Sequence, residues 1–354
     1  MKLINIRKAR PGDILSYNIM TETGQIMLRD GMVLSSDYIK KIKYMGINYI
    51  YIKDELLEDI APINPELVKL KAEVVKSFNN MYNRVQNEDL SQIEGINNNV
   101  RSLVDFIVSS KDINLVYLSD LKTFDNYTFI HSLNTSLTAL FIGKHMGFSR
   151  ESLVEITLGS LLHDIGKTKI PKAILNKTGK LSSEEFEVMK KHPLHGHDVI
   201  FRMPSVSPMA RMISLQHHER LDGTGYPNGL LDNEITMYSK IAALSDVYDA
   251  LSNNRVYRNA LPTDEAYDII VKNTGIYFDP KVVEVFKREF SVYPIGTQVE
   301  VTGGMIGYVV KQNRGEQRRP VIRLAYNAIG EKLAYPIELD LKAIDGIKVE
   351  KAVV

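Results

Sequence analysis

The chain has 354 residues, of which 44% are hydrophobic and 25% charged, and its formal net charge is +1. This length allows two or three domains with a buried core, and the balanced charge argues against polymeric nucleic acid as a partner. The absence of cysteine excludes disulfides and thiolate metal sites. We find no signal peptide and no apolar stretch long enough to span a membrane, so we predict a cytoplasmic protein with no membrane contact.

Residues 1–58 are predicted to form a small N-terminal α+β module. Strand-like runs at 24–34 and 47–52 flank a helical segment at 37–45, and Gly46 is suited to end that helix. The module is a candidate regulatory part, through which the chain could form a homodimer or bind a signalling partner. Acidic residues and two prolines in 53–66 indicate a linker.

Residues 62–290 are predicted to form a helical bundle, so the fold class is mainly α. Apolar residues recur at helical spacing, as in Leu67, Leu70, Val74 and Phe78, and Pro65 stands where a helix can begin. The same spacing predicts five helices, at 65–85, 96–108, 129–147, 151–167 and 235–253.

Residues 291–354 are predicted to form a small β-rich module, because period-two alternation and glycine turns replace the helical pattern. Arg314, Arg318 and Arg319 in NRGEQRRP have the RxxxR spacing of PilZ-type binders of cyclic di-GMP. The polar and glycine motif that follows in that family is missing, and we interpret the segment as a solvated hairpin.

Histidines and carboxylates recur through the helical region at intervals of about 25 to 32 residues. One helix and one connection fill such an interval, so each cluster can return to the same end of a bundle. The candidates are His131, His163 with Asp164, His192, His217 with His218, and Asp246.

Imidazole and carboxylate together are ligands for divalent metal ions, and Asp164 has two oxygens with which it could bridge two of them. Neighbouring side chains on a helix diverge by about 100°, so His217 and His218 fit best where a helix ends, as the glycines after them predict. A single histidine on a helix is more often a packing residue, and we assign that role to His145, His195 and His197.

The sequences LLHDIGK, KHPLHG, HHERLDGTGYPNG and LSDVYDALSNNRVYR, between Asp125 and Leu261, resemble the HD-GYP phosphodiesterases, a branch of the HD-domain metal phosphohydrolases. The resemblance implies hydrolysis of cyclic di-GMP to linear pGpG, and often on to GMP, by a hydroxide bridging metal ions that are usually iron or manganese.

Carried onto this sequence, the resemblance implies a role for each motif residue. The implied metal ligands are His131, His163, Asp164, His192, His217, His218 and Asp246. Lys167 would bind the scissile phosphate beside Asp164, and Arg255 and Arg258 would hold the substrate from the far side. Gly225, Tyr226 and Pro227 would form a substrate-binding loop, in which we expect Asp222 to anchor the turn.

Some members of this family hold a third metal with a glutamate one helical turn before the first histidine. Tyr127 occupies that position here, so we predict two divalent ions, although Asp125 is near enough in sequence to compensate. Two alternatives to an active phosphodiesterase stay open. One is a cyclic di-GMP receptor with little turnover, and the other is a phosphodiesterase for a different cyclic dinucleotide.

Overall fold

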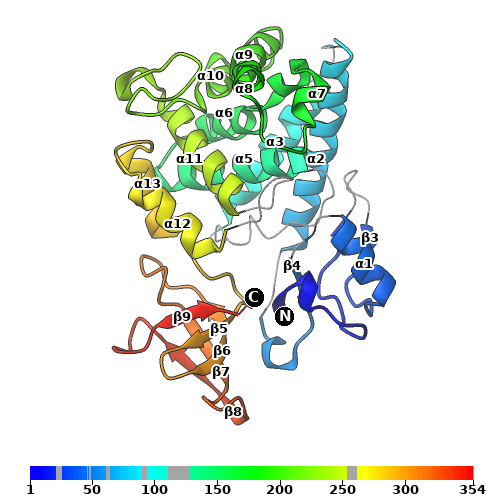
Figure 1. Ribbon diagram of the computed structural model, residues 1–354, viewed down its shortest axis with the longest axis vertical. Coiled ribbons are helices and arrows are strands. Elements are labelled where there is room, and N and C mark those ends of the chain that lie inside the picture. Colours follow the sequence, from blue (N-terminus) through cyan, green and yellow to red (C-terminus); the bar gives the residue numbers. More distant parts are fainter. Residues whose placement is uncertain are drawn as a thin grey trace. The chain divides into compact units, whose positions relative to one another are not determined.

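The computed structural model describes residues 1–20, 26–45, 47, 49–60, 64–89, 94–110, 127–252 and 261–353. Within them the chain is mainly α-helical, as predicted, with a small antiparallel sheet near its C-terminus (Figure 1). It divides into two compact units, a helical unit within residues 65–286 and a second unit from residues 1–64 together with 287–354. The predicted division into three domains, at 1–58, 62–290 and 291–354, stays a prediction. No helix in the described residues is both long and apolar enough to cross a lipid bilayer.

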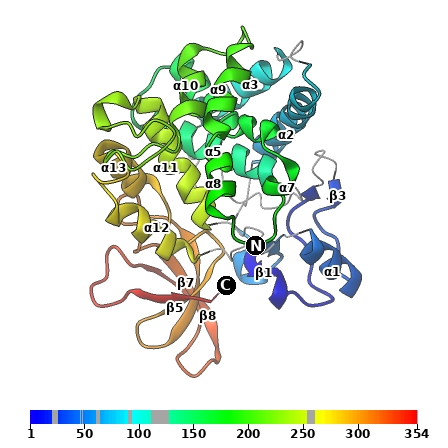
Figure 2. The same ribbon diagram turned by 45° about the horizontal axis from the view of Figure 1, so that its top comes forward.

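The helical unit is organised around α5 (Tyr127–His145), which packs against both α6 (Arg150–Leu161) and α11 (Met237–Ser252) (Figures 1 and 2). Every residue from 131 to 143 is buried, as expected for a helix enclosed on all sides. The other helices of the unit are α2 (Pro65–Gln86), α3 (Glu94–Ser109), α7 (Lys172–Leu175), α8 (Ser183–Met189), α9 (His192–Phe201), α10 (Pro208–Gln216), α12 (Thr263–Lys272), α13 (Pro280–Glu289) and the 3-10 helices η3 (Ile165–Lys169) and η4 (Asp232–Glu234).

Four of the five helices predicted in this unit are confirmed as α2, α3, α5 and α11, with ends that differ by a few residues. The fifth, predicted at 151–167, ends earlier, because α6 stops at Leu161 and η3 begins at Ile165. His163 and Asp164 therefore lie in the turn between two helices. Such a turn frees both side chains from the helical spacing that would have pointed them about 100° apart.

The N-terminal part of the second unit is a small α+β structure, as predicted. β1 (Lys2–Asn5) pairs with β4 (Tyr49–Ile52) and β2 (Ile19–Met20) with β3 (Ile26–Leu28), both antiparallel. The predicted helix is α1 (Ser36–Tyr44), which begins where the Ser35 side chain accepts a hydrogen bond from the amide of Tyr38. Two 3-10 helices, η1 (Ile6–Lys8) and η2 (Glu55–Leu57), complete this part.

The C-terminal part is an antiparallel sheet with the strand order β8-β7-β6-β5-β9. Its strands are β5 (Gln298–Val301), β6 (Met305–Lys311), β7 (Val321–Tyr326), β8 (Lys332–Asp340) and β9 (Val349–Ala352). The Arg319 guanidinium donates to the backbone oxygens of Leu341 and Ile344, at 2.7 and 2.8 Å. This arginine therefore holds a turn, in line with a structural role for the NRGEQRRP segment.

Candidate metal centre

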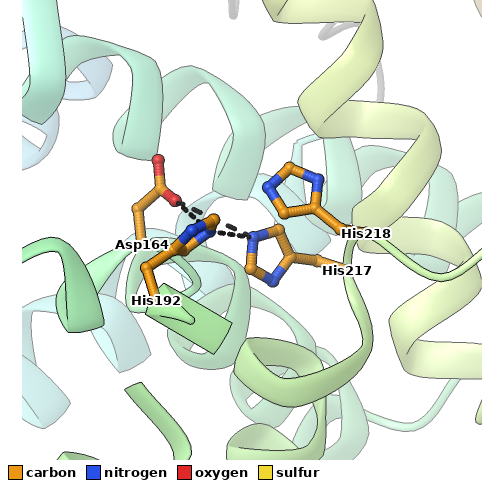
Figure 3. A group of neighbouring side chains, drawn as sticks. All are labelled: Asp164, His192, His217 and His218. Atoms are coloured by element: carbon orange, nitrogen blue, oxygen red, sulfur yellow. Dashed lines mark hydrogen bonds and ion pairs between the residues drawn. The ribbon is translucent and has the colours of Figure 1, made fainter. Parts of the chain in front are cut away.

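The structure brings all seven predicted ligands together inside the helical unit. They form three overlapping groups in which every ligand atom lies within 4.8 Å of the others: Asp164, His192, His217 and His218; His131, His163 and Asp164; His163, His217 and Asp246. Figure 3 shows the first group, with its side chains pointing toward one another. Six of the seven residues are buried, and the His218 side chain is 24% exposed.

Each ligand comes from the end of an element or from a buried helix face. His131 lies in α5 and Asp246 in α11, and these two helices pack together. His192 is the first residue of α9. His217 is the C-cap of α10, which confirms that the histidine pair stands where a helix ends.

Two glycines of the recognised motifs explain how Asp164 and His192 meet. A Cβ atom on Gly166 would lie 2.0 Å from the backbone oxygen of His192 and 2.3 Å from the amide nitrogen of Gly196. Only glycine at position 166 allows η3 to approach α9 this closely. The glycines of HDIGK and HPLHG therefore bring two parts of the site together by backbone packing.

The carboxylate of Asp164 divides its two oxygens between two pairs of histidines. Oδ1 lies 3.3 Å from Nε2 of His192 and 3.8 Å from Nε2 of His217. Oδ2 lies 3.3 Å from Nε2 of His163 and 3.7 Å from Nε2 of His131. This is the arrangement that the sequence predicts for a carboxylate shared by two cations.

Three of the histidines are held in one tautomer by the backbone. Their Nδ1 atoms lie within hydrogen-bond distance of a carbonyl oxygen three residues earlier: His163 with Ser160 at 2.7 Å, His192 with Met189 at 2.8 Å, and His217 with Ser214 at 2.9 Å. A carbonyl can only accept, so each Nδ1 carries the proton. The Nε2 lone pairs that face the site are then free to bind a metal.

Several inward-facing atoms lack a suitable partner. Among the residues described, Nε2 of His163 and Oδ1 of Asp164 are buried without any hydrogen bond. Nε2 of His192 lies 3.3 Å from Nε2 of His217, although both atoms are acceptors in the tautomer set by the backbone. Buried acceptors that face one another are unfavourable unless a cation lies between them. The residues present therefore fit divalent metal ions.

Asp249 is a residue of the site that the sequence argument missed. Its Oδ2 lies 2.7 Å from Nδ1 of His131, while Oδ1 of Asp246 lies 3.0 Å from Nε2 of the same ring. Burial alone would lower the pKa of His131, but the hydrogen bonds to Asp246 and Asp249 outweigh it and raise that pKa to about 9. The signal was present in SDVYDA, where Asp249 follows Asp246 by one helical turn.

The charge states of the other residues suit cation binding near neutral pH. Burial, together with the nearby histidines, lowers the pKa of His217 to about 4, despite its contact with Asp164. Burial opposes ionisation of Asp164, but His163 and Lys167 outweigh it and hold its pKa well below the usual range. The site therefore offers a neutral imidazole and an ionised carboxylate, the forms that bind metal.

Lys167 reaches into the same site. Its Nζ lies 2.5 Å from Oδ2 of Asp164, and the side chain is 26% exposed. The residues are three apart across the start of η3, so the predicted closeness of Lys167 to Asp164 is confirmed. Its role toward a phosphate stays a prediction.

The glycine-rich loop is built largely by its own contacts. A Cβ atom on Gly225 would lie 2.4 Å from the amide nitrogen of Arg220 and 2.5 Å from the Cα atom of Glu219. The Glu219 carboxylate accepts hydrogen bonds from the amides of Asn228 and Leu230. Gly225 is thus required by close backbone packing, whatever its role toward a substrate.

Asp222 anchors the turn, as predicted. Its Oδ1 accepts hydrogen bonds from the amide and the hydroxyl of Thr224, at 3.0 and 2.7 Å. Tyr226 stacks on His218 with ring centroids 4.6 Å apart, so the loop does reach the metal-binding residues.

Some predicted residues lie outside the described residues, namely Arg255, Arg258 and Asp125, and the side chain of Tyr127 is not described either. The substrate contacts of the two arginines therefore stay predictions, and so does the absence of a third metal.

Comparisons with known proteins agree with this geometry. The model of the HD domain family matches residues 119–282, which include all seven predicted ligands. The chain is 35% identical over 214 residues to a cyclic di-GMP phosphodiesterase of Pseudomonas aeruginosa, and 34% identical over 240 residues to one of Thermotoga maritima. Residues 119–282 therefore contain an HD domain, and the similarity to these phosphodiesterases supports the HD-GYP resemblance of the motifs.

These matches cover 60% and 64% of this chain, and 51% and 63% of the relatives. The chain is also similar to a 3'3'-cGAMP-specific phosphodiesterase of Vibrio cholerae, with 34% identity over 48% of this chain and 36% of that one. The solved structure of Bd1817, an HDG"Y"P protein from Bdellovibrio bacteriovorus, aligns over 80% of this chain and 97% of its own, with a TM-score of 0.53 and 18% identity, which supports the fold alone.

Proposed function

We propose that this chain is a metal-dependent phosphodiesterase that hydrolyses cyclic di-GMP to linear pGpG, and to GMP when the second bond is also cut. The observation that carries the proposal is the buried Asp164 carboxylate, whose two oxygens each face a separate pair of histidine Nε2 atoms. Relatives named as cyclic di-GMP phosphodiesterases support the choice of substrate.

The proposed cofactor is a pair of divalent cations, iron or manganese. Nitrogen and oxygen ligands without sulfur favour such ions. When bound, two such ions can lower the pKa of a water molecule to about 7 and neutralise phosphate charge. The chain itself fixes the histidine tautomers through backbone carbonyls and excludes bulk water from the six buried ligands.

Residues around the candidate metal ligands are proposed to contact the substrate. Lys167 would bind a non-bridging phosphate oxygen, because its ammonium lies beside Asp164 and remains partly exposed. Arg255 and Arg258 are proposed to hold the other side of the nucleotide, and the loop at Gly225, Tyr226 and Pro227 to border it. We further propose that the protein acts in the cytoplasm, with the N-terminal module as a surface for a second copy or a signalling partner.

The direct test is anaerobic purification with elemental analysis, followed by chromatography of the products formed from cyclic di-GMP. We expect two iron or manganese ions per chain and the appearance of pGpG. Three ions per chain would overturn the metal count. Protein that carries both ions and leaves cyclic di-GMP intact would overturn the proposed activity and favour a receptor.

Lys167→Ala tests the proposed phosphate contact. We expect both ions to stay bound and kcat to fall by about a hundredfold, since a positioned charge is removed from the transition state. Lys169→Ala is the matched control, because Lys169 in the same 3-10 helix pairs with Glu88 instead. Equal kcat values for the two variants would contradict the assignment.

A different cyclic dinucleotide is the second candidate substrate, favoured by the similarity to the 3'3'-cGAMP-specific phosphodiesterase. Hydrolysis of cyclic di-GMP, 3'3'-cGAMP and cyclic di-AMP at equal concentrations separates the two candidates. The ratio of their kcat/KM values identifies the preferred substrate.

A further inference from the structure

A large aromatic side chain near the metal-binding residues is partly exposed. Phe186 lies in α8 and is 46% exposed, whereas Phe78, Phe141 and Phe286 of the same unit are at most 2% exposed. An exposed aromatic ring beside a polar site has a face on which a ligand ring can stack.

The position of Phe186 is fixed by its short helix. Ser182 and Glu185 form a capping box, in which each side chain accepts a hydrogen bond from the other residue's amide. Nζ of Lys177 lies 2.5 Å from Oε2 of Glu185 and adds a third contact to this helix start. The ring is therefore presented by a rigid support and needs no rearrangement to receive a ligand.

A series of rings leads from the metal-binding residues to Phe186. The Tyr226 ring stacks on His218 and lies 6.4 Å from His192, both measured between centroids. The Phe186 ring lies 6.4 Å from the Tyr226 ring, at an angle of 75°. Phe186 is thus the exposed outer member of a series that begins at the candidate ligands.

A lysine lies beside the ring and is itself paired with a carboxylate. Nζ of Lys190 lies 5.6 Å from the centroid of Phe186 and 2.6 Å from Oε1 of Glu187. Aromatic rings bind nucleobases by stacking, and every base has a face that can stack. A cyclic dinucleotide with one phosphodiester at the metal-binding residues carries its bases outward on the attached riboses.

We propose that Phe186, beside the edge of Tyr226, is a base-binding platform, on which one purine of the substrate stacks while its phosphodiester lies at the metal-binding residues. This inference rests on the proposed function, since it assumes a cyclic dinucleotide substrate. It makes Phe186 a determinant of affinity and leaves the chemical step to other residues.

The kinetic test compares Phe186→Ala with Phe201→Ala in the manganese-loaded protein. Phe201 is also an exposed phenylalanine of the helical unit, 68% exposed, but the Arg211 guanidinium lies 4.8 Å from its ring centroid. We expect Phe186→Ala to raise KM for cyclic di-GMP about tenfold, the low end of the effect of removing one stacking partner. Its kcat should stay within about twofold of the parent value, and Phe201→Ala should change neither constant. An unchanged KM in Phe186→Ala would overturn the platform.

Inhibition by GMP and by ribose 5-phosphate separates base binding from a general loss of structure. Phe186→Ala should weaken inhibition by GMP about tenfold and leave inhibition by ribose 5-phosphate unchanged, because only GMP has a base to stack. An equal loss for both inhibitors would show that the substitution acts on the fold or on the phosphate site, and would also overturn the proposal.

Fluorescence provides a test that does not require turnover. The chain has no tryptophan, so Phe186→Trp introduces a single indole that can still stack. Cyclic di-GMP should quench its emission at saturation, with little quenching in Phe201→Trp. Quenching without hydrolysis would refute the proposed activity and support the platform, whereas hydrolysis without quenching would refute the platform alone. If the protein shows neither hydrolysis nor quenching, the proposed activity and the platform are both refuted.

Discussion

The helical unit and the unit formed by residues 1–64 and 287–354 bury very different side chains. The former encloses His131, His163, Asp164, His192, His217 and Asp246 at 5% exposure or less. Among the described residues of the latter, no histidine, lysine or arginine is buried, and the Glu289 side chain, 7% exposed, is paired with Arg288 and Arg314. Apolar side chains such as Leu57, Tyr308 and Ala325 fill the interior. Buried ionisable groups cost stability when they lack partners. The cluster of facing histidines and carboxylates in the helical unit therefore marks function, whereas the described residues of the other unit are held by apolar packing and paired charges.

If this contrast is correct, substitutions in the metal site should remove function, and substitutions in the second unit should remove stability. The largest effect is expected for Asp164→Ala. Both carboxylate oxygens that face the histidine pairs are lost, so metal content should fall below one ion per chain and phosphodiesterase activity by at least about a hundredfold. Elemental analysis and product chromatography measure the two quantities. Asp198→Ala is the control, because that side chain is 72% exposed on α9. Full metal loading in Asp164→Ala would break the comparison.

Leu57→Ala should show the opposite pattern. Leu57 is fully buried against Tyr308 and Ala325, and the cavity left by its truncation should lower the free energy of unfolding by about 2–5 kcal/mol. Urea denaturation followed by circular dichroism measures this loss. Metal content per folded chain should match that of the parent protein. If metal content per folded chain also fell in Leu57→Ala, packing in the second unit would affect the metal site, and the contrast between the two units would not hold.

Asp249→Asn should have an intermediate effect within the metal site. The amide keeps the shape of the side chain but removes the charge that holds His131 through Nδ1. Loss of such an orienting carboxylate lowers metal affinity by about 10- to 100-fold. Competition with a chelator measures the affinity, and Asp198→Asn provides the matched control. An unchanged affinity would reduce Asp249 to a packing role.

The smallest effect is expected at the ion pair between Asp59 and Arg323, joined by two contacts of 2.6 and 2.7 Å. The hydrogen bond to Arg323 lowers the pKa of Asp59 to about 2, from 3.8. The pair therefore stabilises the fold above about pH 4 and loses that contribution as the pH falls toward 2. Since Asp59 is 63% exposed, Asp59→Asn should cost less than about 1 kcal/mol at pH 6 and a smaller amount at pH 2.5. Urea denaturation at both pH values measures the difference in unfolding free energy between the parent protein and Asp59→Asn. A larger difference at pH 2.5 than at pH 6 would contradict the prediction.

Patterns within the sequence were sufficient to predict the helical class, the position of most helices and the residues that meet in the candidate metal centre. Periodic apolar residues specify which face of a helix is buried, and the motifs bring metal-binding side chains at intervals that one helix and one connection can span. The end of α6 before His163, and the hydrogen bond from Asp249 to His131, lay beyond that local information.

The way in which those residues meet depends on contacts between distant segments. The two oxygens of Asp164 face different histidine pairs because Gly166 allows η3 to pack directly on α9, a contact between segments more than 25 residues apart. Gly225 similarly serves the packing of its own loop. Periodicity in a sequence encodes burial but not the identity of the element on the other side. That identity depends on close packing between distant segments, which only the folded chain specifies.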